Sequence, residues 1–160
     1  MLACELVSGF ASVLRMTWSV AVAGQSVRAF RSWVMLTAVA LPVRISVVGC
    51  APAHGRWRVS WLIANLSDEA LLLQDAWIPH GRFRGEGHVG IGAHVPAGGS
   101  YLLDLNVSAS ERDGTVVENA FLILRVRGAN AAWRVFARMR VEFSEASVQP
   151  VVEAVTAQRL

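Results

Sequence analysis

The segment AFLILRVRGANAAWRVFARMRVEF, residues 120–143, carries the strongest structural signal of the chain. Its halves, 120–126 and 133–143, place apolar residues at every second position, which is typical of β-strands with one buried face. The residues between them, 128–132, begin with Gly-Ala-Asn, and glycine and asparagine favour tight turns. We therefore predict a hairpin in which three pairs lie directly opposite each other: Leu124 and Val135, Arg125 and Arg134, and Val126 and Trp133.

The same alternation extends through the rest of the chain from residue 42 onward. Apolar residues alternate in five further stretches: Val43 to Val47, Trp57 to Ile63, Leu71 to Trp77, Tyr101 to Val107 and Val151 to Ala157. Turn-forming residues separate these stretches at 65–68, 96–100 and 112–114. Seven or eight short antiparallel strands therefore predict an all-β sandwich over residues 40–160.

Two segments of this region resemble a known layout. Residues 65–73, NLSDEALLL, and 95–103, VPAGGSYLL, resemble the strand–turn–strand pattern of bacterial immunoglobulin-like accessory domains. The resemblance covers residues 42–158 and implies an immunoglobulin-like β-sandwich that binds or assembles with other proteins. The Cys…Trp…Cys signature of antibody domains is absent, so no antibody-type disulfide is implied.

The charge of the chain is spread in a way that disfavours nucleic acid as a partner. The net charge is +3, and all fifteen basic residues are arginines, as expected of a GC-rich bacterial genome. Residues 35–160 hold twelve arginines against eleven acids, so this region is nearly neutral and does not favour a polyanion. The two cysteines, Cys4 and Cys50, form no metal or disulfide pattern, which favours a reduced cytoplasmic setting.

Residues 1–39 form an apolar N-terminal segment that permits several interpretations. Its uncharged stretches are too short for a spanning helix, which needs about 20 residues. The segment is a helical or disordered extension, or it precedes a true translation start at Met35. In a third interpretation it is an export signal, with residues 47–50, VVGC, as a lipobox and Cys50 as the acylated residue of an envelope lipoprotein.

Three histidines, His80, His88 and His94, lie within 15 residues of each other. Zinc sites need three or four converging ligands, and these spacings match no standard ligand pattern. A small metal-dependent enzyme built on the three histidines is therefore only an alternative hypothesis, and we expect no cofactor. The chain also contains no GxSxG, HExxH or glycine-rich phosphate loop, so we expect no enzymatic activity.

The loop around Pro79 offers a first group of binding candidates: His80, Arg82, Phe83 and Arg84. Phe83 lies between two arginines, where it acts either as a plug that covers the core or as an exposed anchor for a partner. We favour the plug, because most loop aromatics in compact domains cover the core. Glu118 is positioned to pair with an arginine of this loop.

The outward face of the predicted hairpin offers the second group. It would carry three apolar and five basic residues: Phe121, Ile123, Phe136, Arg125, Arg127, Arg134, Arg138 and Arg140. Like charges directly opposite each other destabilise a sheet. Either something covers this face (an anionic partner, a second subunit or the N-terminal segment), or Glu118 and Glu142 neutralise it. We expect a non-catalytic binding or assembly module with a protein partner or self-association.

Overall fold

The structure is a computed structural model that describes residues 42–144 and 147–160. These residues form nine strands and no helix: β1 (Val43–Ala53), β2 (Arg56–Asn65), β3 (Leu71–Trp77), β4 (Arg84–Gly85), β5 (Val89–Val95), β6 (Ser100–Ser108), β7 (Val116–Arg127), β8 (Ala132–Ser144) and β9 (Ser147–Arg159). The predicted N-terminal segment, 1–39, lies outside the described residues. The residues of the lipobox interpretation, 47–50, lie within β1, where Cys50 pairs with Val59. No helix in the described ranges is long and apolar enough to cross a membrane.

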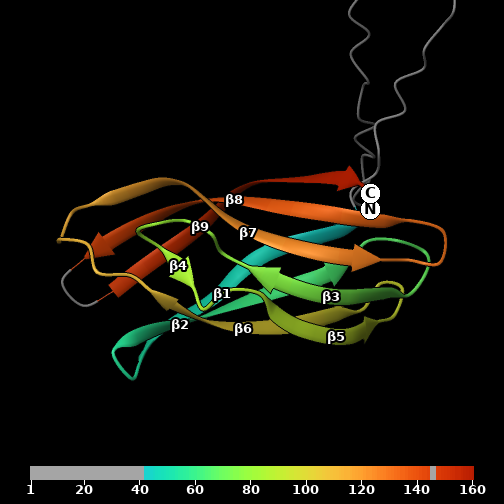
Figure 1. Ribbon diagram of the computed structural model, residues 1–160, viewed down its shortest axis with the longest axis horizontal. Helices are drawn as coiled ribbons and strands as arrows, with labels where there is room; N and C mark the ends of the chain where they lie inside the picture. Colours follow the sequence, from blue (N-terminus) through green and yellow to red (C-terminus); the bar gives the residue numbers. More distant parts are fainter. Residues whose placement is uncertain (1–41, 145–146) are drawn as a thin grey trace, which may run out of the picture. The chain divides into compact units, whose positions relative to one another are not determined.

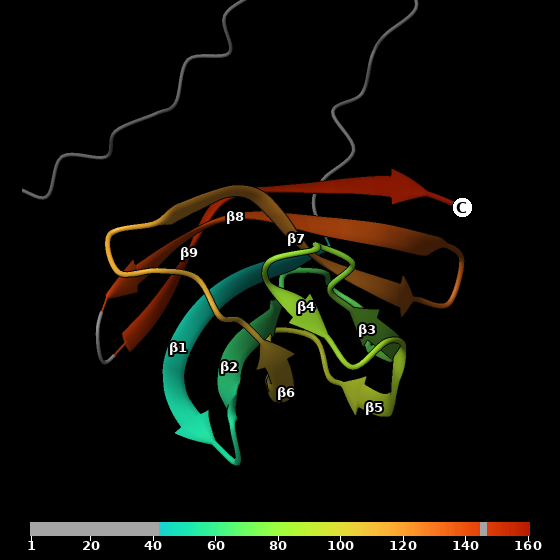
Figure 2. The same ribbon diagram turned by 60° about the vertical axis from the view of Figure 1, so that its left-hand side comes forward.

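The strands form two antiparallel sheets that pack as a β-sandwich, which confirms the predicted fold class. The four-stranded sheet has the order β1-β2-β6-β4, and the five-stranded sheet has the order β5-β3-β7-β8-β9. Figures 1 and 2 show β7, β8 and β9 stacked over β1, β2 and β6. The structure has nine strands where seven or eight were expected. One of the nine, β4, has only two residues.

The β7–β8 hairpin has the register that the sequence predicts. Leu124 pairs with Val135, Arg125 with Arg134 and Val126 with Trp133. The valines and Leu124 are buried, while the two arginines point to the outer side of the five-stranded sheet. The turn closes with a hydrogen bond from the Gly128 amide to the Ala131 carbonyl. The alternating pattern and the turn residues were therefore sufficient to fix which side chains enter the core.

The core lies between the facing sides of the two sheets. The largest fully buried side chains are Trp61, Phe83, Ile63, Leu71, Leu73, Ile78, Leu122, Leu124 and Met139. Each strand of the main sheets contributes alternate residues, as in the buried positions of β6 and β8. Burying a large apolar side chain contributes roughly 1.5–3 kcal/mol, so this layer is the main source of stability.

The strand register shifts at four places, and the shifts in β3 and between β8 and β9 correct the sequence prediction. In β3 the register shifts between Leu73 and Asp75, so Ala76 and Ile78 enter the core and Trp77 is only half-buried. The prediction placed Trp77 on the same side as Leu71 and Leu73, which is wrong because the bulge adds one residue to the strand. In β9, Val151 is likewise exposed and not buried as expected.

Asn65 links the turn after β2 to the turn after β5, which lie side by side at one end of the sandwich. Its side chain is 2% exposed, and its Nδ2 donates to the carbonyls of Glu69 (2.8 Å), Val95 (3.1 Å) and Pro96 (2.9 Å). Its Oδ1 accepts from the amide and the hydroxyl of Ser67, at 2.9 and 2.7 Å. One buried amide therefore satisfies the polar groups of two turns, which would otherwise be costly to bury.

Cys50 lies in the middle of β1, opposite Val59 of β2. Burial raises the pKa of the Cys50 thiol from 9.0 to about 11. The thiol should therefore stay protonated at neutral pH, and only thiolates react rapidly with alkylating reagents.

In a Cys4→Ser variant we expect iodoacetamide to alkylate folded Cys50 about 100-fold more slowly at neutral pH than the urea-unfolded chain. The rate should rise about tenfold per pH unit until the pH approaches 11, because each unit increases the thiolate fraction tenfold. Mass spectrometry of timed samples measures both rates. Equal rates in the folded and unfolded chains would contradict a protected thiol.

Candidate functional site

The outer side of the five-stranded sheet is the surface on which the charged candidates meet; we call it the basic face. Two rows of residues cross it from β3 to β9. The first row consists of Asp75, Arg125, Arg134 and Gln158, and the second of Trp77, Ile123, Phe136 and Thr156. A polar row therefore lies directly beside an aromatic and aliphatic one.

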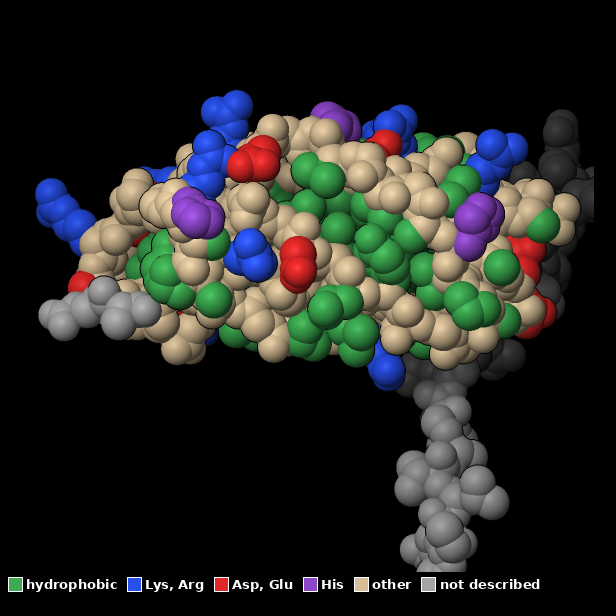
Figure 3. All heavy atoms as spheres, turned by 90° about the horizontal axis from the view of Figure 1, so that it is seen from below, with side chains coloured by type: hydrophobic (Ala, Val, Ile, Leu, Met, Phe, Trp, Pro, Cys, Tyr) green, Lys and Arg blue, Asp and Glu red, His purple; other side chains and the backbone are tan. Residues whose placement is uncertain are grey.

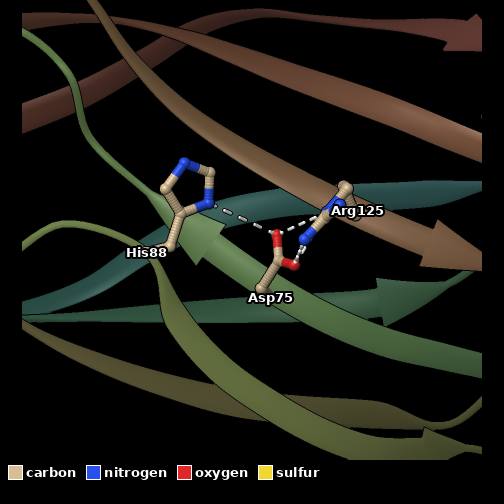
Figure 4. A network of polar contacts seen from close by, with 3 residues as sticks. All are labelled: Asp75, His88 and Arg125. Atoms are coloured by element: carbon tan, nitrogen blue, oxygen red, sulfur yellow. Dashed lines mark hydrogen bonds and ion pairs between the residues drawn. The ribbon is translucent and has the colours of Figure 1, made fainter.

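Asp75 and Arg125 form the most ordered ion pair of the basic face. The bulge in β3 directs Asp75 toward β7, where the carboxylate is only 7% exposed. The Arg125 Nε donates to both carboxylate oxygens, at 2.9 and 2.7 Å, and Nη2 donates to Oδ2 (Figure 4). The hydrogen bonds and charge of Asp75 raise the pKa of Arg125 further above its ordinary value. The pair removes one of the two opposed arginine charges that the sequence placed here.

His88 extends this pair at the edge of the sheet. Its ring stacks on Trp77 with 4.2 Å between ring centroids, and its Nδ1 lies 3.9 Å from Asp75 Oδ1 (Figure 4). A histidine beside a carboxylate can act as a general base when a proton donor lies within reach. Among the hydrogen bonds of the described residues, His88 contacts no hydroxyl or thiol. The geometry therefore orients the histidine without supplying a nucleophile.

At the other end of the basic face, three glutamates form ion pairs with two arginines. Arg138 Nε lies 3.4 Å from Glu153, and Arg140 lies 3.4 Å from Glu118 and 3.0 Å from Glu142. Glu118 and Glu142 thus offset arginine charge on the basic face, as the sequence analysis offered as its second alternative. The expectation that Glu118 pairs with the loop after β3 is wrong; in that loop Arg82 lies 3.8 Å from Glu111 instead.

Arg127 and Arg134 are the basic residues of this face that lack a carboxylate. Within residues 42–144 and 147–160, neither of them forms an ion pair. The Nε of Arg134 is also buried and has no hydrogen-bond partner in this part of the chain. A buried donor without an acceptor costs about 1–3 kcal/mol. Because the residue as a whole is only half-buried, the Arg134 guanidinium can still pair with a carboxylate that a partner brings.

The four loop candidates lie after β3 and apart from the basic face. Phe83 is fully buried in the core, which supports the plug and removes this residue from the exposed candidates. His80 accepts a hydrogen bond from the Arg82 amide at 3.3 Å and so stabilises its own turn. Arg84 is exposed on β4, which pairs with β6 of the other sheet. The loop candidates therefore do not join the basic face.

The histidine cluster of the sequence does not converge in the structure. No group of three or more His, Cys, Asp or Glu side chains in the described ranges could hold a metal ion. His88 approaches Asp75, His80 caps a local turn, and His94 is exposed on β5 opposite Leu72. The metal-dependent alternative therefore has no geometric support in this part of the chain.

The opposite side of the sandwich carries a different kind of surface. Figure 3 looks at the side where β2, β5 and β6 lie in Figure 1 and shows hydrophobic side chains gathered near its middle. On the four-stranded sheet Leu62 pairs with Leu102, and Val48 and Leu102 are 54% and 55% exposed. We call these three residues the apolar patch. Single exposed apolar residues are common on protein surfaces, whereas here Leu62 and Leu102 lie directly opposite each other.

Asp75 and Glu153 are the two members of the site that sequence reasoning missed. Each interrupts a run of apolar and small residues in its strand, which is the signal that could have marked it.

Comparisons with protein-family models, curated proteins and solved structures found no match.

Proposed function

We propose that residues 42–158 form an immunoglobulin-like, non-catalytic binding module that engages another protein through the basic face. Strand order supports the immunoglobulin-like part. β1, β2, β6 and β4 follow the order A-B-E-D, while β3, β7 and β8 follow C-F-G. β5 lies where variable-type domains add a strand beside C. The layout departs from that family in that β4 precedes β5, β9 is additional, and no inter-sheet disulfide joins the described strands.

The observation that carries the binding role is the pair of arginines without carboxylates beside half-buried aromatic residues. Arg134 lies in the row next to Trp77, Ile123 and Phe136, and Arg127 lies one row further on the same side. Arginine and aromatic side chains are enriched at protein interfaces and at their energetic hot spots. A partner that brings carboxylates and apolar groups would satisfy both kinds of residue at once.

The test is a pull-down from the native host with purified protein as bait. We expect an Arg134→Glu, Arg138→Glu variant to recover at least about tenfold less of the protein that the native bait captures, because rim and buried charges both contribute to recognition. Arg58→Glu, on the other sheet, is the matched control and should recover as much as the native bait. Equal recovery by all three baits would contradict the proposal.

Metal analysis of the same preparation separates this proposal from an enzyme. We expect no stoichiometric zinc or iron, because the three histidines are dispersed. A stoichiometric metal that is lost in a His88→Ala variant would overturn the binding module in favour of the enzyme.

A further inference from the structure

The two ends of the basic face have net charges of opposite sign. At the arginine end, three arginines meet one aspartate: Arg125, Arg127, Arg134 and Asp75. At the glutamate end, three glutamates meet two arginines: Glu118, Glu142, Glu153, Arg138 and Arg140. One end therefore has a net charge of +2 and the other of −1, and the two ends lie on the same sheet face.

Apolar residues lie between the two ends. Ile123 pairs with Phe136, and Phe121 pairs with Arg138 one step further along the strands. All three apolar residues are half-buried and face outward, and Val151, which is 54% exposed, lies opposite Arg140 on β9. A partner with the same pattern in reverse order would cover the apolar residues and match both charged ends.

We infer that this partner is a second copy of the chain, packed face to face on the basic face about a two-fold axis near Arg138. The inference rests on the proposed function, since it names the protein that the basic face binds. A two-fold axis that lies between the two sheets, parallel to them and across the strands, turns the two faces toward each other and reverses the direction of the strands. Each end of one copy therefore meets the opposite end of the other.

The positions on β8 fit such an axis. Arg134 and Glu142 each lie four residues from Arg138, on either side of it, and all three belong to the outward-facing set of β8. An axis at Arg138 therefore places Arg134 of each copy near Glu142 of the other. Arg138 itself lies close to the axis, where Glu153 at 3.4 Å offsets its charge. Arg134, which is half-buried and forms no ion pair in the described part of its own chain, would gain a carboxylate from the other copy.

The size of the face suits a dimer of ordinary stability. The four strands β3, β7, β8 and β9 are spaced about 4.8 Å apart, and ten residues span about 33 Å, which gives a footprint of roughly 650 Å². A standard interface buries about 800 Å² on each partner, measured over the rougher accessible surface. Two sheets packed face to face are also the arrangement that already forms the core of each copy.

Other occupants match the face less well. A nucleic acid or another polyanion would contact the arginine end but would be repelled by the net negative glutamate end. The apolar patch consists of three uncharged side chains, which would not fix the orientation of a second copy. A second copy is the occupant whose charges are complementary along the whole length of the face.

Sedimentation equilibrium of the full chain tests the inference with two single charge reversals and their combination. We expect the native protein to dimerise, and Arg134→Glu and Glu142→Arg each to weaken the dimer at least about tenfold by placing like charges together. The double variant, Arg134→Glu with Glu142→Arg, restores opposite charges across the axis and should return to within about threefold of the native affinity.

Arg58→Glu is the control and should dimerise like the native protein, and thermal melts verify that every variant is folded. If Arg134→Glu lowers the melting temperature, Arg127→Glu at the same end replaces it.

The inference is overturned if the native protein is monomeric at about 100 µM. It is also overturned if the double variant dimerises no more tightly than the single variants. A third contrary result is that Leu102→Glu in the apolar patch dissociates the dimer while Arg134→Glu does not. A monomer whose pull-down still depends on Arg134 and Arg138 would leave the proposed function standing and refute only self-association. A monomer without such dependence would refute both.

Discussion

An Asn65→Asp variant should lose about 3–5 kcal/mol of the free energy of unfolding, although the two side chains have nearly the same shape. Nδ2 of Asn65 donates to three backbone carbonyls, and a carboxylate cannot donate to any of them. The substitution also places a carboxylate at a position that is 2% exposed and faces three carbonyl oxygens. Only the two Ser67 donors that now bond Oδ1 would face its charge favourably. Because a domain of this size is stable by only about 5–15 kcal/mol, the loss is a large fraction of the total.

Urea unfolding followed by tryptophan fluorescence measures this loss. Ser67→Ala is the matched control, because it removes one donor to Oδ1 and leaves the three Nδ2 bonds in place. We expect the control to lose only about 1 kcal/mol. A loss below about 1 kcal/mol for Asn65→Asp would show that the amide does not hold the two turns together.

A Phe83→Ala variant should be destabilised by about 3–5 kcal/mol, because the substitution leaves a cavity in the core where Phe83 is fully buried. The loop that contains Phe83 is also held by β4, where the Gly85 amide donates to the Ile78 carbonyl at 3.1 Å. Loss of the ring should therefore loosen the segment from Pro79 to Gly85 before the rest of the sandwich unfolds.

Equilibrium unfolding and hydrogen exchange measure the two parts of this prediction. Phe83→Leu keeps most of the volume and should lose less than about 1.5 kcal/mol. Arg84→Ala, at an exposed neighbouring position, should stay within about 0.5 kcal/mol of the native protein. A Phe83→Ala variant with native stability but impaired partner binding would mean that the ring is an anchor and not a plug.

The parts of the fold that follow from local alternation could be predicted from the sequence. Apolar residues at every second position of β2, β6, β7 and β8 identify both the strands and their buried sides. The register of β7 against β8 followed from the turn residues between them, because a short hairpin turn leaves few alternative pairings.

The bulges could not be predicted in this way. An inserted residue in β3 changes which side Trp77 and Ala76 occupy, yet no single residue of LLLQDAW marks the position of the insertion. The choice depends on how β3 fits between β5 and β7, which come from distant parts of the chain. Local periodicity therefore fails wherever two neighbouring strands must adjust to each other.

Only part of the candidate site could be predicted from the sequence. The arginines and aromatics of β7 and β8 lie together as expected, because they share one hairpin. Asp75 lies 50 residues from Arg125, and Glu153 reaches Arg138 from a third strand, so their pairing depends on tertiary structure that alternation does not specify. The different net charges of the arginine end and the glutamate end are thus a property of the folded sheet.

The tight turn between β1 and β2 has a practical consequence. His54 and Gly55 both have positive φ angles, 46° and 75°, so the two strands are joined by the two-residue connection that suits a hairpin. Both residues are exposed, and a side-chain atom added at Gly55 would meet nothing within 4 Å. A short peptide tag or a fluorophore inserted at this tip would tether the protein to a sensor surface without obstructing the surfaces under test.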